Sequence, residues 1–182
     1  LGGGVVGENA AIIATGMRGK VYVVDKSKER LKQLHEMFGD KIIPTESDNT
    51  NIKKLVSECD LLIGGVLIPG AEAPKLVTKE MIKNMKRGSV VVDVAIDQGG
   101  CVETSKPTTH ANPTYLVDEV VHYCVANMPG GVPRTSTMAL NKATLPLLIK
   151  LADQGYKKTL QENKNYLAGL NVYKGKITFK GV

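Results

Sequence analysis

The amino-acid sequence predicts an α/β protein in which a parallel β-sheet carries helices on both faces. Two features indicate this class. Short apolar runs alternate with segments of helical periodicity at least three times along the chain. The runs are continuously apolar, which is typical of strands buried on both faces of a parallel sheet. Parallel neighbours need crossover connections, and helices usually supply them.

The first half of the chain contains two such strand-and-helix units. Ser27 is a suitable N-cap because its hydroxyl can accept a hydrogen bond from a free backbone N–H, and Gly39 is a natural stop. The expected elements are a helix over 5–17, a strand over 20–25, a helix between Ser27 and Gly39, the start of the next unit at 41–44, a helix over 51–59 and a strand over 60–64.

The second half continues the pattern and then changes character. The expected elements are a helix over 79–85 capped by Thr78, a strand over 89–96, a strand over 120–126, a helix over 135–154 that contains Pro146, a polar helix to about 167, and two short extended pieces within 171–179. We expect residues 1–140 to form one domain with a truncated first strand. Residues 141–182 lack a core of their own and are expected to pack on a domain outside this sequence, so the chain is expected to be part of a longer protein.

Composition narrows the possible functions. The chain has 182 residues, enough for one main core, and only 4% aromatic residues, too few for an aromatic-rich module that binds single-stranded nucleic acid. The apolar run at 61–68 is far shorter than a bilayer span. The net charge is +6, but the lysines and arginines are scattered, which favours a solvated basic surface over a polyanion-binding stripe.

The cysteines and histidines form no recognisable site. Three cysteines without a CxxC or Cys/His ligand pattern argue against a disulfide framework and against a metal centre, and they favour a reducing, cytoplasmic location. The histidines are interpreted as structural or surface residues because none has a Ser or Cys partner in a triad pattern.

A glycine pattern opens the chain. Gly2, Gly4 and Gly7 match GxGxxG ahead of a predicted helix, and Asp25 ends the next strand 18 residues after Gly7. Glycines permit a tight turn and close approach to a pyrophosphate, and the helix N-terminus offers free N–H donors. The carboxylate of Asp25 can accept hydrogen bonds from both ribose hydroxyls and would repel a 2′-phosphate, which favours NAD over NADP. The alternative is a plain glycine turn with a surface Asp. The positive charges of Lys26 and Arg30 leave some room for the 2′-phosphate of NADP.

Ligands of such sheets collect beyond the carboxyl ends of the strands. The loop at 64–70 could pack against adenine or be an ordinary turn. Asp97 follows the strand over 89–96 and could handle a proton at the nicotinamide end, or it could only cap a turn before Gly99. Asn127 offers an amide to the nicotinamide side, although it could equally be a turn residue.

These segments resemble the alanine dehydrogenase family over essentially the whole chain. The resemblance rests on Gly-Gly-Gly-Val-Val-Gly with Asp25, on the run Asp-Val-Ala-Ile-Asp-Gln-Gly-Gly-Cys at 93–101, on Val-Ala-Asn-Met-Pro-Gly at 125–130 and on Val-Pro-Arg-Thr-Ser at 132–136. It implies a doubly wound, Rossmann-type fold and NAD as cofactor.

The resemblance also implies site residues. Asp97 matches the family's active-site aspartate. Besides the three glycines, the implied NAD-binding residues are Val5, Val6, Asp25, Arg30, Ser47, Val66, Leu67, Val94, Ala95, Ile96, Asp97, Lys106, Val125, Ala126, Asn127 and Met128.

The implied activity is the interconversion of L-alanine with pyruvate and ammonia. In the family, the catalytic histidine and the substrate-holding lysine and arginine lie in a separate domain, mostly upstream of the glycine loop, and the enzymes are usually homo-oligomers, often hexamers. The tail from about Asn141 resembles the segment that packs on that domain. Two alternatives stay open: the NAD-binding component of a proton-translocating nicotinamide nucleotide transhydrogenase, and a non-catalytic NAD-binding module. The run Gln-Gly-Gly-Cys at 98–101 favours alanine dehydrogenase.

Overall fold

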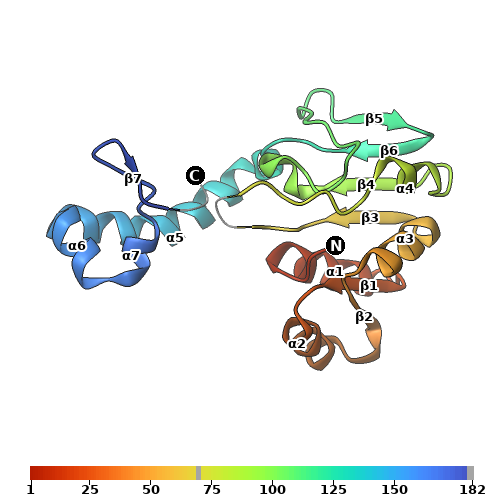
Figure 1. The fold of residues 1–182 in the computed structure, drawn as a ribbon, viewed down its shortest axis with the longest axis horizontal. Coiled ribbons are helices and arrows are strands. Elements are labelled where there is room, and N and C mark those ends of the chain that lie inside the picture. Colours follow the sequence, from red (N-terminus) through yellow and green to blue (C-terminus); the bar gives the residue numbers. More distant parts are fainter. Residues whose placement is uncertain (69–70, 180–182) are drawn as a thin grey trace. The chain divides into compact units, whose positions relative to one another are not determined.

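The computed structural model describes residues 1–68 and 71–179 and shows alternating helices and strands (Figure 1). The α-helices are α1 (Val5–Gly16), α2 (Lys28–Phe38), α3 (Asn49–Glu58), α4 (Lys79–Lys83), α5 (Pro133–Gln154), α6 (Tyr156–Glu162) and α7 (Lys164–Ala168). The strands are β1 (Val21–Asp25), β2 (Ile42–Glu46), β3 (Leu61–Gly64), β4 (Val90–Asp93), β5 (Thr114–Val117), β6 (Val120–Tyr123), β7 (Val172–Tyr173) and β8 (Lys176–Ile177). Short 3₁₀ helices are η1 (Gly39–Lys41), η2 (Val94–Gln98) and η3 (Met128–Gly131).

The strands pair mostly in parallel. β1 pairs with β2, and a four-stranded sheet has the order β3-β4-β6-β5, in which β5 is antiparallel to β6. β7 and β8 form a separate hairpin. The predicted α/β class with a parallel sheet is confirmed.

The first two residues of the chain connect the two groups of strands. The Leu1 amino group donates to the Ile63 carbonyl at 2.7 Å, and the Gly65 N–H donates to the Leu1 carbonyl at 2.8 Å. On the other side, the Gly2 N–H donates to the Val24 carbonyl at 2.8 Å. Leu1 and Gly2 therefore lie between the carboxyl ends of β1 and β3 as a strand would.

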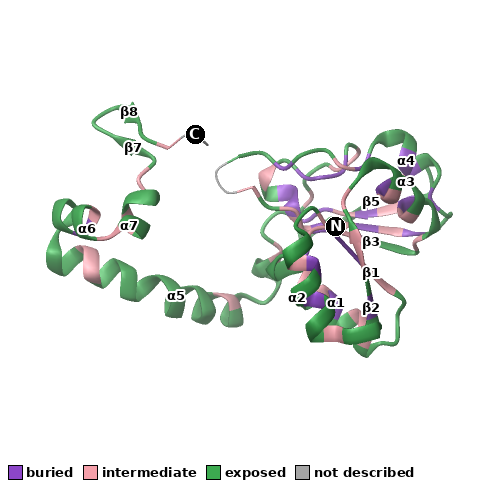
Figure 2. Cartoon of the chain, turned by 60° about the horizontal axis from the view of Figure 1, so that its bottom comes forward, coloured by how far each residue is buried: buried purple, intermediate pink, exposed green. Residues whose placement is uncertain are grey.

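Neighbouring residues of β1 show that helices cover both faces. Val23 belongs to a buried cluster with Ala11 of α1 and Leu34 of α2, whereas Val24 belongs to a second cluster with Ile52 of α3. Successive side chains of a strand point to opposite faces, so the two clusters lie on opposite sides of the sheet. Figure 2 shows buried residues on the strands and on the inner faces of these helices.

Two predicted strands are shorter in the structure, and one observed strand was not predicted. The strand expected over 89–96 ends at Asp93, where the chain turns into η2, and the strand expected over 120–126 ends at Tyr123. The strand β5 was not predicted, and it makes one edge of the sheet antiparallel. Of the predicted loop at 64–70, Pro69 and Gly70 lie outside the described residues.

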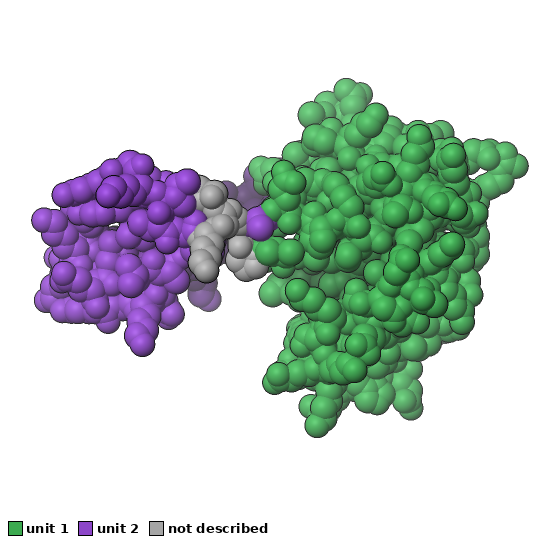
Figure 3. Space-filling model, in the orientation of Figure 1, with its two compact units in different colours: residues 1–68, 72–128 green, residues 69–71, 129–182 purple. Residues whose placement is uncertain are grey.

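The chain divides into two compact units, shown in separate colours in Figure 3. One unit comprises Leu1–Ile68 and Glu72–Met128 and holds all the strands from β1 to β6. The other comprises Pro69–Ala71 and Pro129–Val182, in which α5 has no buried residue. Among the described helices, none has both the length and the apolar character needed to cross a bilayer.

Candidate cofactor site

The glycine loop is a tight turn that only glycine can make. Gly2 has φ +86°, a left-handed conformation that side chains disfavour, and a Cβ there would lie 2.8 Å from the Gly65 carbonyl oxygen. A Cβ on Gly7 would lie only 1.9 Å from the Gly2 carbonyl oxygen. The start of α1 is therefore packed directly against the loop backbone, as the spacing of the motif predicts.

The N-terminus of α1 faces open space. Gly4 is the N-cap, has no side chain to satisfy the first N–H groups, and a Cβ added to it would meet no atom within 4 Å. Val5 and Val6 follow with 79% and 37% of their surface exposed. A twelve-residue helix with an uncapped and accessible N-terminus offers N–H donors and the positive end of its dipole to an anion.

Asp25 is fixed beside this loop by two backbone hydrogen bonds. Its Oδ2 accepts from the Gly3 N–H at 2.7 Å and its Oδ1 accepts from the Ser27 N–H at 2.8 Å. Each carboxylate oxygen can accept a further hydrogen bond, so a pair of neighbouring hydroxyls could bind without displacing either contact. The structure thus brings the strand-end carboxylate and the glycine loop together.

Arg30 is held by the same loop. Its Nε donates to the Gly3 carbonyl at 2.6 Å, and its guanidinium forms an ion pair with Glu8 in the first turn of α1. A guanidinium already engaged by a carboxylate is a poor receptor for a phosphate, because the ion pair must first be broken. The Glu8–Arg30 ion pair could not be predicted, because nothing in the sequence indicated a role for Glu8.

Ser47 and the loop after β3 lie at the same edge of the sheet. The Ser47 N–H donates to the Asp25 carbonyl at 2.9 Å, so this half-buried residue directly follows the end of β2. Val66 is half-buried against the larger core cluster, whereas 63% of the Leu67 surface is exposed. Leu67 is thus the exposed apolar side chain among the described residues of this loop, 64–68.

Asp97 and Asn127 meet although they are 30 residues apart. Oδ1 of Asp97 accepts from the Asn127 N–H at 3.1 Å, and the His110 ring nitrogen Nε2 lies 3.1 Å from the Asn127 carbonyl oxygen. Asn127 has φ +52°, a left-handed conformation that asparagine tolerates better than most residues. Both side chains are exposed at the carboxyl ends of β4 and β6, where the sequence analysis expected them.

The other predicted residues of the segments 94–97 and 125–128 differ in how far their side chains are buried. Ala95, Ile96 and Val125 have buried side chains, so only their backbone groups are available to a ligand. Val94 and Met128 are half-buried, and Ala126 is exposed.

Asp93 at the end of β4 anchors the turn that carries Asp97. Its buried carboxylate accepts from the Cys101 N–H at 3.3 Å and from the Val102 N–H at 3.1 Å. Burial, with the Asp93 carboxylate beside it, raises the pKa of the Cys101 thiol to about 12. Cys101 is therefore a protonated packing residue and not a nucleophile at neutral pH.

Lys106 is positioned by a residue that the sequence analysis missed. The Tyr115 hydroxyl accepts from the Lys106 N–H at 2.6 Å and donates to the Thr104 carbonyl at 3.0 Å. The Tyr115 ring stacks on His122, whose imidazole is bonded to the Thr104 hydroxyl at 2.8 Å; burial lowers the pKa of His122. No sequence signal marked Tyr115, because it lies on the unpredicted strand β5.

The family of the chain is shown by comparison with known proteins. The sequence profile described as "Alanine dehydrogenase/PNT, C-terminal domain" matches residues 1–180. The chain belongs to this family. It is 57% identical over 182 residues to alanine dehydrogenase of Halomonas elongata and 54% identical over 183 residues to alanine dehydrogenase 2 of Staphylococcus aureus.

The chain spans about half the length of these relatives, because the match covers 100% of this chain and 49% of each of them. A solved L-alanine dehydrogenase superposes with a TM-score of 0.86 at 49% identity, covering 98% of this chain and 49% of the other. A transhydrogenase from Sinorhizobium meliloti has a TM-score of 0.75 at 23% identity and shares the fold. The predicted Rossmann-type fold class and the predicted family are confirmed.

Proposed function

We propose that this chain is the NAD-binding half of an NAD-dependent L-alanine dehydrogenase, which converts L-alanine, NAD⁺ and water into pyruvate, ammonium, NADH and a proton. The observation that carries the proposal is the cradle formed by the uncapped N-terminus of α1 and the Asp25 carboxylate, joined through the Gly3 backbone. The alanine substrate is inferred from the two alanine dehydrogenases that are 54–57% identical to this chain.

The described residues fit a dinucleotide. The N–H groups at Val5 and Val6 would bind the pyrophosphate, and Asp25 would accept hydrogen bonds from the adenosine ribose hydroxyls. NADP fits less well, because the Asp25 charge would repel a 2′-phosphate and Arg30 is already paired with Glu8. Leu67 would contact the adenine, and Ser47 would lie beside it.

Asp97 and Asn127 would lie at the nicotinamide end of the cofactor. NAD supplies the hydride acceptor, and the residues of this chain hold the ring in position. The exposed Asp97 carboxylate is hydrogen-bonded only weakly to the Asn127 N–H, at 3.1 and 3.4 Å, and is therefore able to accept or relay a proton during turnover. Lys106, held through its backbone by Tyr115, would complete this side of the pocket.

A partner domain and a homo-oligomer are also proposed from the family relationship. We infer that a domain outside this sequence supplies the substrate-binding groups and that residues 141–182 pack on it. The support is α5, which carries exposed apolar side chains at Leu145, Leu148 and Ile149 and buries none of its residues. We also propose assembly into a homo-oligomer such as a hexamer, in the cytoplasm, where the three free cysteines would stay reduced.

Titration of the folded chain with NADH, followed by the fluorescence of the reduced nicotinamide, tests the proposal. We expect saturable binding of NADH and binding of NADPH that is at least about tenfold weaker, since the phosphate meets a carboxylate. Absence of saturable NADH binding, or equal affinity for NADPH, would overturn it. Alanine-dependent NADH production by the full-length protein separates a dehydrogenase from a transhydrogenase component and from a binding module.

A further inference from the structure

The chain reverses direction directly after Asp97, in a segment with two left-handed glycines in succession. Gly99 has φ +87° and Gly100 has φ +75°, conformations that side chains disfavour. We call residues 98–101 the double-glycine turn. It brings the Cys101 N–H back to the buried Asp93 carboxylate, so the position of Asp97, just ahead of it, depends on how firmly this turn is held.

The N–H groups of the double-glycine turn are bonded on its inner side. Those of Gly99 and Gly100 donate at 3.0 and 2.9 Å to carbonyls of η2, the short helix that carries Asp97. The Cys101 N–H donates to Asp93, as described above. The inner side of the turn is therefore tied to η2 and to the end of β4.

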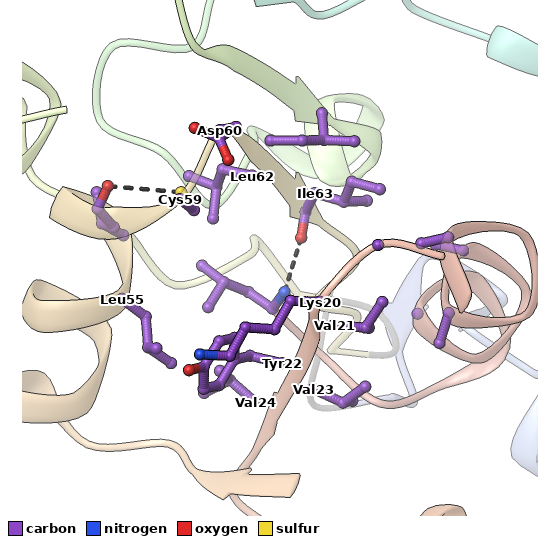
Figure 4. A pocket seen from close by; sticks show the side chains of 18 of the residues that line it. Lys20, Val21, Tyr22, Val23, Val24, Leu55, Cys59, Asp60, Leu62 and Ile63 are labelled. Carbon is purple, nitrogen blue, oxygen red and sulfur yellow. Dashed lines mark hydrogen bonds between the residues drawn. The ribbon is translucent and has the colours of Figure 1, made fainter. Parts of the chain in front are cut away.

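The inner side also has no room to move toward β3. Figure 4 shows Ile63 of β3 beside a cavity of about 440 Å³, which is lined mainly by α1, β1, α3 and β3. The next residue, Gly64, packs against the turn instead: a Cβ added to Gly64 would lie 3.1 Å from Oδ1 of Asp93 and would overlap the Cys101 sulfur. Any loosening of the turn must therefore occur on its outer side.

The carbonyl groups of the turn are bonded by a different segment, residues 73–77, which leads into α4. The Ala73 N–H donates to the Gln98 carbonyl at 2.9 Å, and the Leu76 N–H donates to the Cys101 carbonyl at 2.9 Å. These two backbone bonds hold the first and the last carbonyl of the double-glycine turn. The carbonyls of the two glycines lie between them in the sequence.

Lys75 binds the two glycine carbonyls through its side chain. Its ammonium donates to the Gly100 carbonyl at 2.8 Å and also to the Gly99 carbonyl. An ammonium carries three N–H donors on one atom, so a single side chain can bind two neighbouring carbonyls. Hydrogen bonds from a charged donor are roughly twice as strong as neutral ones. The segment 73–77 thus holds every carbonyl of the double-glycine turn.

We propose that Lys75 is a positioning residue for the alanine dehydrogenase reaction, which holds the double-glycine turn and thereby fixes the Asp97 carboxylate at the nicotinamide end. The inference rests on the proposed function and deepens it, because Lys75 acts through Asp97 and not on the cofactor itself.

Loss of Lys75 should affect the chemical step more than cofactor binding. Without the ammonium, the two glycine carbonyls depend on water, and glycine backbones adopt many conformations. A turn that samples several conformations places the Asp97 carboxylate correctly for only part of the time, and a displacement of about 1 Å can lower a rate by about 100-fold. Binding of NADH depends mainly on α1 and Asp25, which this change does not touch.

Variants of the full-length protein test this role. Lys75→Met keeps the aliphatic stem and removes the charge, and we expect kcat for alanine-dependent NADH production to fall by about 10- to 100-fold while the NADH dissociation constant stays within about threefold of the parent. Lys75→Gln should behave in the same way. Lys75→Arg, which keeps a charged donor, should restore kcat to within about threefold. Lys83→Met, at an exposed lysine of α4, is the matched control and should change neither quantity.

A double-mutant comparison separates positioning of Asp97 from a general structural effect. If Lys75 acts through Asp97, Lys75→Met should lower kcat by less than about twofold in a protein that already carries Asp97→Asn. Equal losses in the two backgrounds would overturn the proposal. An unchanged kcat in Lys75→Met, or an equal loss of kcat and of NADH affinity, would overturn it as well.

Hydrogen exchange in the full-length protein gives a readout that needs no activity. The Gly99 and Gly100 amides should exchange about tenfold faster in Lys75→Met than in the parent or in Lys83→Met. Unchanged exchange would mean that Lys75 does not hold the turn. If the parent itself forms no NADH from alanine, the proposed function is wrong, and the exchange rates alone then decide whether Lys75 holds the turn.

Discussion

The Asp25 carboxylate links the glycine loop to the proposed ribose site, because the oxygens that bond Gly3 and Ser27 are the same atoms that would receive the sugar hydroxyls. Its place at the end of β1 could be predicted from the sequence, since the motif fixes the spacing. Its bond to Gly3 and the Glu8–Arg30 ion pair could not, because they depend on how α1 and α2 are oriented in the folded chain.

Replacing Asp25 tests this residue most directly. Asp25→Ala removes two charge-assisted hydrogen bonds to the ribose, each worth about 1.5–3 kcal/mol, so NADH affinity should fall by about 100-fold or more in the fluorescence titration. Asp40→Ala, which removes an exposed carboxylate from η1 after α2, is the matched control and should leave affinity unchanged. Equal effects of the two changes would show that Asp25 acts only through net charge.

The Cys101 thiol predicts a pH dependence of stability. Its pKa is about 12 in the folded protein and 9.0 in its unperturbed state, so above about pH 9 the unfolded chain loses a proton that the folded chain retains. The free energy of unfolding should therefore fall as the pH rises from about 9 toward 12. Urea unfolding at pH 8, 9 and 10 measures this decline.

The variant Cys101→Ala isolates the thiol. We expect it to be less stable than the parent at pH 8, because a buried side chain is lost, and to show a shallower decline between pH 8 and pH 10. A decline as steep as that of the parent would mean that other groups cause the alkaline loss.

At the scale of elements, the loop and α1 form one rigid piece. Gly7→Ala places a methyl group 1.9 Å from the Gly2 carbonyl oxygen, so the loop or the helix must move. We expect a loss of about 1–3 kcal/mol in unfolding free energy, or more, together with loss of NADH binding. Chemical denaturation and titration measure the two effects.

Gly4→Ala is the control for this substitution, because its Cβ would meet no atom within 4 Å and its φ of −70° suits any residue. Its unfolding free energy should stay within about 0.5 kcal/mol of the parent. If both variants lose the same stability, the close approach at Gly7 does not explain the glycine pattern.

The differences between predicted and observed elements have local causes. The strand expected over 89–96 stops at Asp93 because its buried carboxylate binds the N–H groups of Cys101 and Val102 and so turns the chain back on itself. The strand β5 escaped prediction because its hairpin turns through Asp118 and Glu119 with φ of +50° and +63°, a conformation usually signalled by Asn-Gly or Asp-Gly. The pattern of apolar residues predicts buried strands well, but it does not reveal where a polar side chain ends a strand.

At the scale of the whole molecule, the chain carries one half of a proposed active site. Asp97 can be tested only where the other half is present. In the full-length protein Asp97→Asn should lower kcat for alanine-dependent NADH production by about 10²- to 10⁴-fold, while the NADH dissociation constant changes by less than about threefold. Steady-state kinetics together with NADH titration measure the two quantities.

The same experiment can contradict the assignment. An unchanged kcat would remove Asp97 from proton handling and leave it as the residue that fixes the Asn127 turn. A parallel loss of kcat and of NADH affinity would place it in cofactor binding instead. Asp40→Asn serves again as the control, with neither quantity changed.

A crystal structure of the full-length protein with bound NAD⁺ would show where the cofactor lies. We expect the pyrophosphate at the N-terminus of α1, within hydrogen-bond distance of the Val5 and Val6 N–H groups, and both adenosine ribose hydroxyls donating to Asp25. A cofactor bound away from α1, or one whose ribose does not contact Asp25, would contradict this expectation.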